Sequence, residues 1–363
     1  MNTLPQSQFD ALFLENRPLM DVRAPVEFAK GAFPCAHNRP LMNDREREQV
    51  GTCYKQQGQQ AAIELGHELV GGQVKEERVQ SWLDFARAHP DAVLYCFRGG
   101  MRSQIVQRWL AEAGVEMPYV QGGYKALRSH LIEVNDRAAR RPIHVVAGTT
   151  GSGKTEFIQQ FAEAVDLEGL AEHRGSAFGR RLRAQPSPID FENRLAVALL
   201  EQQRAGIAPL LLEDESRLIG SVALPLSLFE AMREAPLFVL EEEFEARVAR
   251  IEKDYILDNL AESQASLGEE AGFEHFAETL RASMGRIRKR LGDQRFQQLN
   301  GLLEEALAAQ QGGDRDGHRE WIRILLRDYY DPMYHYQLDK KAHLIRARGD
   351  HHGLAQQIRA QLG

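Results

Sequence analysis

The stretch Ile143-His-Val-Val-Ala-Gly-Thr-Thr-Gly-Ser-Gly-Lys-Thr155 decides the fold of the second half of the chain. Its opening residues, 143–147, are mostly apolar and β-branched, which predicts a buried strand. Residues 148–155 then match the pattern G-x4-G-K-[ST], and apolar residues at helical spacing follow them. A strand, a glycine-rich loop and a helix in this order predict an α/β fold whose loop binds phosphate groups.

Each residue type in this loop has an expected role. Backbone N–H groups surround phosphate oxygens, Lys154 reaches the terminal phosphate, and Thr155 is placed to hold Mg²⁺. A second buried strand, 208–212, ends in acidic residues, where such folds place a metal-binding carboxylate; we select Asp214, with Glu213 as the alternative. The predicted phosphate-binding set is Gly148, Gly151, Ser152, Gly153, Lys154, Thr155 and Asp214, with Thr155 and Asp214 as candidate Mg²⁺ ligands.

The rest of this half is predicted to be one further strand followed by helices. Residues 236–240 form the strand, and a helix over 241–251 is expected to leave Arg247 and Arg250 outward, where small kinases clamp phosphate. From residue 252 onward the pattern predicts amphipathic helices with Trp321 in their core. A phosphate-binding domain with a helical C-terminal region is therefore expected over residues 141–363.

The first half of the chain is organised around Cys96-Phe-Arg-Gly-Gly-Met-Arg-Ser103. An apolar run, 92–95, precedes this loop and helical spacing follows over 104–113, so Cys96 is expected on a strand-to-helix turn. Loop amides, the helix dipole and two arginines should each lower the pKa of the thiol, and two glycines let the backbone curl around the sulfur. The predicted catalytic set is Cys96, Arg98, Gly99, Gly100 and Arg102.

Three motifs in this half resemble those of the rhodanese family: Asp21–Pro40, the loop at Cys96, and Gln121-Gly-Gly-Tyr124. The resemblance implies a parallel-sheet α/β domain, assigned to residues 1–140, in which Cys96 carries a chalcogen. The loop departs from the family because five residues rather than four separate Cys96 from Arg102, which is the spacing of phosphatases with this fold. A wider cradle suits a tetrahedral phosphate-like group, so a phosphatase and a chalcogen transferase with a phosphate-bearing donor are both open.

Composition limits the remaining choices. No apolar run is long enough to span a membrane and no secretory signal is present, while three Cys in 363 residues do not make a disulfide framework. These features predict a cytoplasmic protein with a reduced Cys96. The net charge of −7 argues against nucleic-acid binding by the overall field, so an RNA partner would need local basic patches.

Basic residues gather in three places. The densest cluster lies over 281–295, a loop rich in Gly and Arg over 173–181 comes second, and Lys55, in an insertion over 42–72, comes third. Basic charge near aromatic residues suits phosphate contacts and base stacking, while solvated helix faces and turns are the plain alternative. The candidate RNA-binding residues are Lys55, Arg174, Arg180, Arg286, Arg288 and Arg290.

The fusion of these two domains resembles one family in particular. Together with Val50–Lys55, His173–Gly179 and Leu212–Arg217, the two loops resemble the tRNA 2-selenouridine synthases over nearly the whole chain. The resemblance implies a transferase that replaces sulfur by selenium at 2-thiouridine of the wobble position in tRNAs for Lys, Glu and Gln. Its co-substrates would be geranyl diphosphate, which forms S-geranyl-2-thiouridine, and selenophosphate, whose selenium passes through Cys96.

These implications fit the residue types. A phosphate-binding loop stabilises a leaving diphosphate as well as a nucleotide, so Lys154 and Thr155 do not require ATP. Mg²⁺ at the loop and an enzyme that supplies selenophosphate are further expectations. Two other classes stay open: a rhodanese-fold phosphatase or sulfurtransferase fused to an ATP-dependent kinase-like domain, and a nucleotide-sensing module without turnover.

Overall fold

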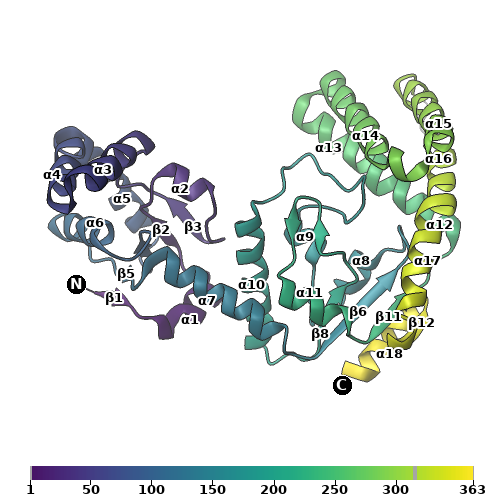
Figure 1. Ribbon diagram of the computed structural model, residues 1–363, viewed down its shortest axis with the longest axis horizontal. Coiled ribbons are helices and arrows are strands. Elements are labelled where there is room, and N and C mark those ends of the chain that lie inside the picture. The colour runs from purple at the N-terminus through teal and green to yellow at the C-terminus, as the bar shows by residue number, and fades with distance from the viewer. Residues whose placement is uncertain (1, 314–316, 363) are drawn as a thin grey trace. The chain divides into compact units, whose positions relative to one another are not determined.

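The computed structural model describes residues 2–313 and 317–362, and the chain divides into two compact units (Figure 1). Met1–Asn135 and Ser187–Glu201 form the first unit, and Asp136–Pro186 and Gln202–Gly363 form the second. A single boundary after residue 140 would assign residues 187–201 to the second unit, whereas they belong to the first.

The first unit is an α/β unit built on a five-stranded parallel sheet in the order β1-β5-β4-β2-β3. Trp82, Leu94 and Trp109 belong to its buried core. The strands are β1 (Thr3–Leu4), β2 (Leu19–Asp21), β3 (Ala36–Asn38), β4 (Val93–Tyr95) and β5 (Tyr119–Val120). The helices are α1 (Phe9–Leu14), α2 (Pro25–Ala29), α3 (Asp44–Gln57), α4 (Gln59–Leu69), α5 (Gly72–Ala88), α6 (Met101–Glu112), most of α7 (Gly123–Ala138) and most of α10 (Pro188–Arg204).

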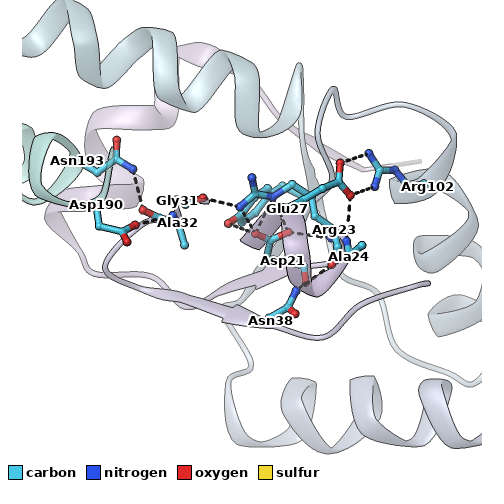
Figure 2. Close-up of polar contacts among 11 residues, drawn as sticks. Asp21, Arg23, Ala24, Glu27, Gly31, Ala32, Asn38, Arg102, Asp190 and Asn193 are labelled. Carbon is cyan, nitrogen blue, oxygen red and sulfur yellow. Dashed lines mark hydrogen bonds and ion pairs between the residues drawn. The ribbon is translucent and has the colours of Figure 1, made fainter. Parts of the chain in front are cut away.

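Two polar residues attach α10 to the rest of this unit, as Figure 2 shows. Asp190 accepts a hydrogen bond from the Ala32 N–H at 2.7 Å, and Asn193 donates one to the Ala32 carbonyl at 2.7 Å. The backbone of one loop residue is therefore satisfied by side chains about 160 positions further along the chain.

The insertion between the first motif and the Cys96 loop forms the helices α3 and α4. Asn43 caps α3, because its side chain accepts from the Glu46 N–H at 2.9 Å while Glu46 accepts from the Asn43 N–H at 2.8 Å. Arg78 of α5 pairs with the same Glu46 at 2.7 Å, which ties the insertion to the helix that follows it.

The second unit is built on another parallel sheet, in the order β12-β11-β6-β8-β7. The predicted α/β class with parallel sheets is confirmed. One edge strand was not predicted, because residues 345–349 pair with β11 although helices were expected there. The strands are β6 (Ile143–Gly148), β7 (Ala164–Val165), β8 (Leu210–Glu213), β11 (Leu237–Leu240) and β12 (Ile345–Gly349), with a separate antiparallel pair β9 (Leu218–Ile219) and β10 (Val222–Ala223).

Helices make up most of the chain after β11, as the sequence predicts (Figure 1). Trp321 is 2% exposed and lies in a core formed by several of them, which confirms its predicted place. No helix among the described residues is long and apolar enough to cross a membrane. The helices of this unit are α8 (Lys154–Ile158), α9 (Leu167–Ala171), α11 (Leu226–Arg233), α12 (Phe244–Ile251), α13 (Asp258–Leu267), α14 (Glu269–Leu291), α15 (Asp293–Gln311), α16 (His318–Leu325), α17 (Asp331–Lys340) and α18 (His351–Leu362).

Candidate functional site

Cys96 lies where β4 ends and the chain turns into α6. The strand ends at Tyr95, and α6 begins at Met101 with Gly100 at its N-cap, so the predicted strand-to-helix turn is confirmed. Cys96 is 3% exposed and belongs to the lining of a cavity of about 510 Å³. A buried sulfur that faces a cavity is protected from solvent yet remains within reach of a bound substrate.

The Cys96 loop lies directly against the turn at Gly122 and Gly123. Gly99 has a φ of +59°, and a Cβ added there would lie 2.4 Å from the Val120 carbonyl oxygen. A Cβ added at Gly123, where φ is +60°, would lie 2.3 Å from the Cys96 carbonyl oxygen. Both positions therefore require glycine. The two motifs, predicted separately, pack against each other backbone to backbone.

Of the remaining residues of the predicted catalytic set, Arg98, Gly100 and Arg102 line the same cavity, whereas Gly99 does not. Arg98 is exposed, and no atom lies within 4 Å of the place that a Gly100 Cβ would take. Arg102 donates to Glu27 at 2.7 Å, so a carboxylate that the sequence analysis did not select holds this guanidinium. Burial alone raises the pKa of Glu27, but the hydrogen bond and charge of Arg102 outweigh burial and leave the pKa lowered.

Asp21 and Arg23 form a buried ion pair (Figure 2). Asp21 is 0% exposed and Arg23 is 2% exposed; the Arg23 Nε and Nη2 groups both donate to Asp21, at 2.9 and 2.6 Å. The Tyr95 hydroxyl donates to the same carboxylate at 2.7 Å, and the Arg23 guanidinium lies 3.9 Å from the centre of the Tyr124 ring. The Tyr124 N–H in turn donates to the Cys96 carbonyl at 2.8 Å, which links the ion pair to the cysteine.

The glycine-rich loop of the second unit has the backbone that phosphate binding needs. Gly151 and Gly153 both have a φ of +81°, a region that favours glycine. Lys154 lies at the start of α8, and its Nζ donates to the Gly148 carbonyl at 3.0 Å. Ser152 is fully buried, and its hydroxyl has no hydrogen-bond partner within the described part of the chain. The structure thus brings the six predicted loop residues together around one turn.

Arg247 and Arg250 stabilise this loop rather than both facing outward. Arg247 is 5% exposed; it donates to the Thr150 carbonyl at 2.9 Å and pairs with Asp331 of α17. The expectation that Arg247 is available to clamp phosphate is wrong, because a buried guanidinium with a carboxylate partner is already satisfied. Arg250 donates to the Gly151 carbonyl at 2.8 Å.

Thr155 lies near two carboxylates. One is Glu213, which the sequence analysis considered, and the other is Glu168, which it did not. The Thr155 hydroxyl donates to Glu168 of α9 at 3.2 Å, and the Glu168 N–H donates to Glu213 at 3.3 Å. Burial, followed by the charges of Glu168 and Asp166, raises the pKa of Glu213 to about 8. Asp214 instead pairs with Lys341 at 2.7 Å, so of the two candidates it is Glu213 that lies with Thr155.

Two of the three predicted basic clusters meet in the second unit. Arg286 of α14 donates to the Ala177 carbonyl at 2.8 Å, which joins this helix to the loop over 173–181. Burial, and then repulsion from Arg180, lowers the pKa of Arg286, so these two cations are close. We call four exposed arginines of these two clusters the arginine patch: Arg180, Arg286, Arg288 and Arg290.

The other two predicted RNA-binding residues lie elsewhere. Arg174 is turned toward the protein, because it donates to the Asn259 side chain at 2.9 Å and lies over the Tyr255 ring. Lys55 is exposed on α3 of the first unit.

Sequence reasoning missed Glu27 and Glu168, each of which contacts a predicted site residue. Glu27 lies within the first motif, Asp21–Pro40, so the motif points to this glutamate but not to its contact with Arg102. Glu168 lies in a five-residue helix with no motif of its own, so no local signal distinguishes it from a solvated glutamate.

By class, the chain is a two-unit α/β protein with a buried cysteine on a strand-to-helix turn in one unit and a glycine-rich, P-loop-like turn in the other. Residues 141–362 match a family model described as the tRNA 2-selenouridine synthase AAA domain. The chain belongs to the tRNA 2-selenouridine synthase family, as its motifs predicted.

Three curated relatives with that name match nearly end to end. One from Shewanella loihica is 54% identical over 98% of this chain and 96% of its own length. One from Pseudomonas fluorescens strain Pf0-1 is 56% identical over 96% and 95%, and one from Hahella chejuensis is 59% identical over 93% and 90%. A crystallised N-terminal domain from Clostridium difficile 630 is 33% identical over 36% of this chain, with a TM-score of 0.33. The rhodanese resemblance of the first unit stays a prediction.

Proposed function

We propose that this chain is a tRNA-modifying transferase that replaces the sulfur of wobble 2-thiouridine by selenium in tRNAs for Lys, Glu and Gln. The observation that carries the proposal is near full-length similarity to relatives named tRNA 2-selenouridine synthase. Two separate anion-binding loops support a reaction with two anionic co-substrates, geranyl diphosphate and selenophosphate.

The first step of the proposal uses the loop over 148–155. The sulfur of 2-thiouridine attacks the allylic carbon of geranyl diphosphate, the carbon–oxygen bond breaks, and diphosphate leaves with the electron pair. Backbone N–H groups and Lys154 stabilise the charge that develops on the leaving group. S-geranyl-2-thiouridine is the product.

The second step uses Cys96. The thiolate of this residue attacks the phosphorus of selenophosphate, the phosphorus–selenium bond breaks, and selenium leaves as hydrogen selenide. The selenide forms a bond to C2 of the modified uridine, while the bond from C2 to sulfur breaks and geranylthiol leaves. Every step is redox neutral, because water then cleaves the phosphorylated cysteine and releases phosphate. Arg98 and Arg102 stabilise the anionic donor, and an enzyme that makes selenophosphate must supply it.

Mg²⁺ fits the first step on the chemistry of its ligands. Thr155, Glu168 and Glu213 offer oxygen donors, and a Glu213 Oε1 that is buried without a partner in the described residues favours a nearby cation. The described part of the chain has no group of three or more His, Cys, Asp or Glu side chains that could hold a metal ion by themselves. Diphosphate oxygens would therefore have to complete the coordination, and Mg²⁺ would supply charge neutralisation of the leaving group.

The arginine patch supports tRNA binding. The protein carries a net charge of −7, so local clusters must hold a polyanion. Arg286 and Arg180 lie close together in the second unit, and Arg290 follows Arg286 by about one turn of α14. Arg288 is also exposed on α14 and pairs with Asp293 at 3.0 Å. Phosphate contacts from such a surface would be insensitive to sequence and sensitive to salt.

The replacement Cys96→Ser tests the division into two steps. We expect this variant to stop selenation and to leave geranylation intact, so that S-geranyl-2-thiouridine accumulates in tRNA, measured by mass spectrometry of wobble nucleosides. Cys35→Ser is the matched control, since burial raises the pKa of the Cys35 thiol to about 11 and keeps it protonated. Only unmodified 2-thiouridine in the Cys96→Ser tRNA would show that the division is wrong.

A further inference from the structure

The cavity beside Cys96 has a lining that an anionic donor does not explain. Its volume is about 510 Å³, and most of the side chains around it are apolar. Arg98 and Arg102 provide cationic groups at one end, next to the cysteine, whereas the rest of the wall offers few hydrogen-bond partners. A phosphate-sized ligand would use only the cationic end of such a space.

The insertion helices build the apolar part. Val50 and Tyr54 come from α3, and Ala62 and Ile63 come from α4; residues of α6, including Trp109, complete the lining. The insertion therefore supplies a wall beside the loop that bears Cys96. Phosphate, metal or selenium chemistry alone does not explain why the chain carries this insertion.

The mouth of the cavity is also apolar. Tyr54 is 58% exposed, Met101 is 40% exposed and Phe97 is 36% exposed, and all three belong to the lining. Large apolar side chains grouped at the rim of a cavity indicate a ligand that covers them.

We infer that this cavity binds the isoprenoid chain of S-geranyl-2-thiouridine during selenation, so that the sulfur carrying the chain lies beside Cys96. The inference rests on the proposed function and names the substrate group that this part of the site recognises. A branched hydrocarbon of two isoprene units has no polar atoms and matches the apolar wall, and the volume lies in the range of about 300–1,000 Å³ typical of small-molecule sites. The polar uracil ring would lie toward the arginines.

A cavity of the second unit is much smaller. It is apolar, lies beside Thr150 of the phosphate-binding loop and measures about 20 Å³, which is enough for about one water molecule. Of these two cavities, the one at Cys96 is the better place for the chain at the stage when geranylthiol leaves.

Chain length on the substrate sulfur tests this inference. Anticodon stem-loops carrying 2-thiouridine with an S-geranyl, S-dimethylallyl or S-methyl group would be selenated by the full-length protein with selenophosphate. We expect kcat/KM to fall by at least about a hundredfold from geranyl to methyl, because each buried carbon contributes to binding. Val50→Trp, which fills the cavity from α3, should lower kcat/KM for the geranyl substrate by about tenfold or more and leave the methyl substrate unchanged.

Val74→Trp is the matched control, since Val74 is 36% exposed on α5 and does not line the cavity. A second measurement is independent of turnover: geranylthiol should change the fluorescence of Trp109, which lines the cavity, with saturation in the wild type and weaker binding in Val50→Trp.

The outcomes separate the inference from the proposed function. Equal kcat/KM for the three alkyl groups, with selenation intact, would overturn the inference and leave the function standing. Equal losses for geranyl and methyl substrates in Val50→Trp would also overturn it, because the cavity would then hold the base rather than the chain. If no S-alkyl substrate is selenated, the function fails, and saturable geranylthiol binding at Trp109 still decides whether the cavity takes an isoprenoid.

Discussion

Replacing Lys154 by Ala should separate the chemistry of the two loops most clearly. A unit charge about 4 Å from a phosphate oxygen contributes about 4 kcal/mol at an effective dielectric constant of about 20. The Lys154 Nζ is partly buried at the mouth of the loop, 3.0 Å from the Gly148 carbonyl, so this effective dielectric is the appropriate one. Only the charge that develops as diphosphate leaves affects the rate, which reduces the effect to about 3 kcal/mol, a factor of roughly 10²–10³ in kcat.

The assay follows S-geranyl-2-thiouridine formed from 2-thiouridine tRNA and geranyl diphosphate by mass spectrometry. Lys253→Ala is the control, because Lys253 lies on the surface with 63% of its side chain exposed and pairs with Asp258. Lys154→Ala should also selenate pre-geranylated tRNA at the wild-type rate. A loss of geranylation smaller than about tenfold, in a folded protein, would refute the assignment of Lys154 to the leaving group.

Lys154 is a better target than its neighbour. Gly153 has a φ of +81°, and a Cβ added there would lie 3.0 Å from the Arg250 guanidinium carbon, so Gly153→Val would combine backbone strain with lost phosphate binding. A change that removes only a charge gives the clearer result.

Two further predictions concern RNA binding and pH. Replacing Arg286, Arg288 and Arg290 together by Gln should weaken binding to all substrate tRNAs alike and reduce the slope of log K against log salt by up to about three, measured by filter binding; unchanged affinity would identify the patch as a solvated helix face. Glu213 has a folded-state pKa raised to about 8, so the folded state holds a proton that the unfolded state releases, and this group's contribution to stability is present below about pH 4.5 and is lost as pH rises toward 8. Glu213→Gln should therefore make thermal unfolding midpoints less dependent on pH between about 6 and about 8; a steeper dependence would contradict the shifted pKa.

Local patterns predicted the parts of the fold that local contacts determine. The apolar run before Gly148 and the glycine spacing after it are contained in a short stretch, and the strand, the loop and the start of α8 followed. The turn at Cys96 was equally local. β12 was missed because its exposed arginines alternate along an edge strand, and only its pairing with β11 shows it to be a strand.

The contacts of the predicted site residues could not be predicted from local patterns either, because they join residues far apart in the chain. Glu27 meets Arg102 across 75 positions, and Lys341 meets Asp214 across 127. The sequence near Asp214 gives no sign that Lys341 forms an ion pair with it. The choice between Asp214 and Glu213 therefore required the three-dimensional structure. The apolar cavity likewise depends on two insertion helices whose hydrophobic residues looked unremarkable one by one.

The path of α10 has a consequence for how the protein is synthesised. The first unit includes residues 187–201, and Asp190 and Asn193 satisfy the backbone of Ala32. While the ribosome is translating the first 186 residues, that N–H and carbonyl have no such partners, although the intervening residues 136–186 already belong to the other unit. The N-terminal unit therefore cannot reach its final form in the order in which it emerges, and must wait on the nascent chain for a helix encoded well downstream.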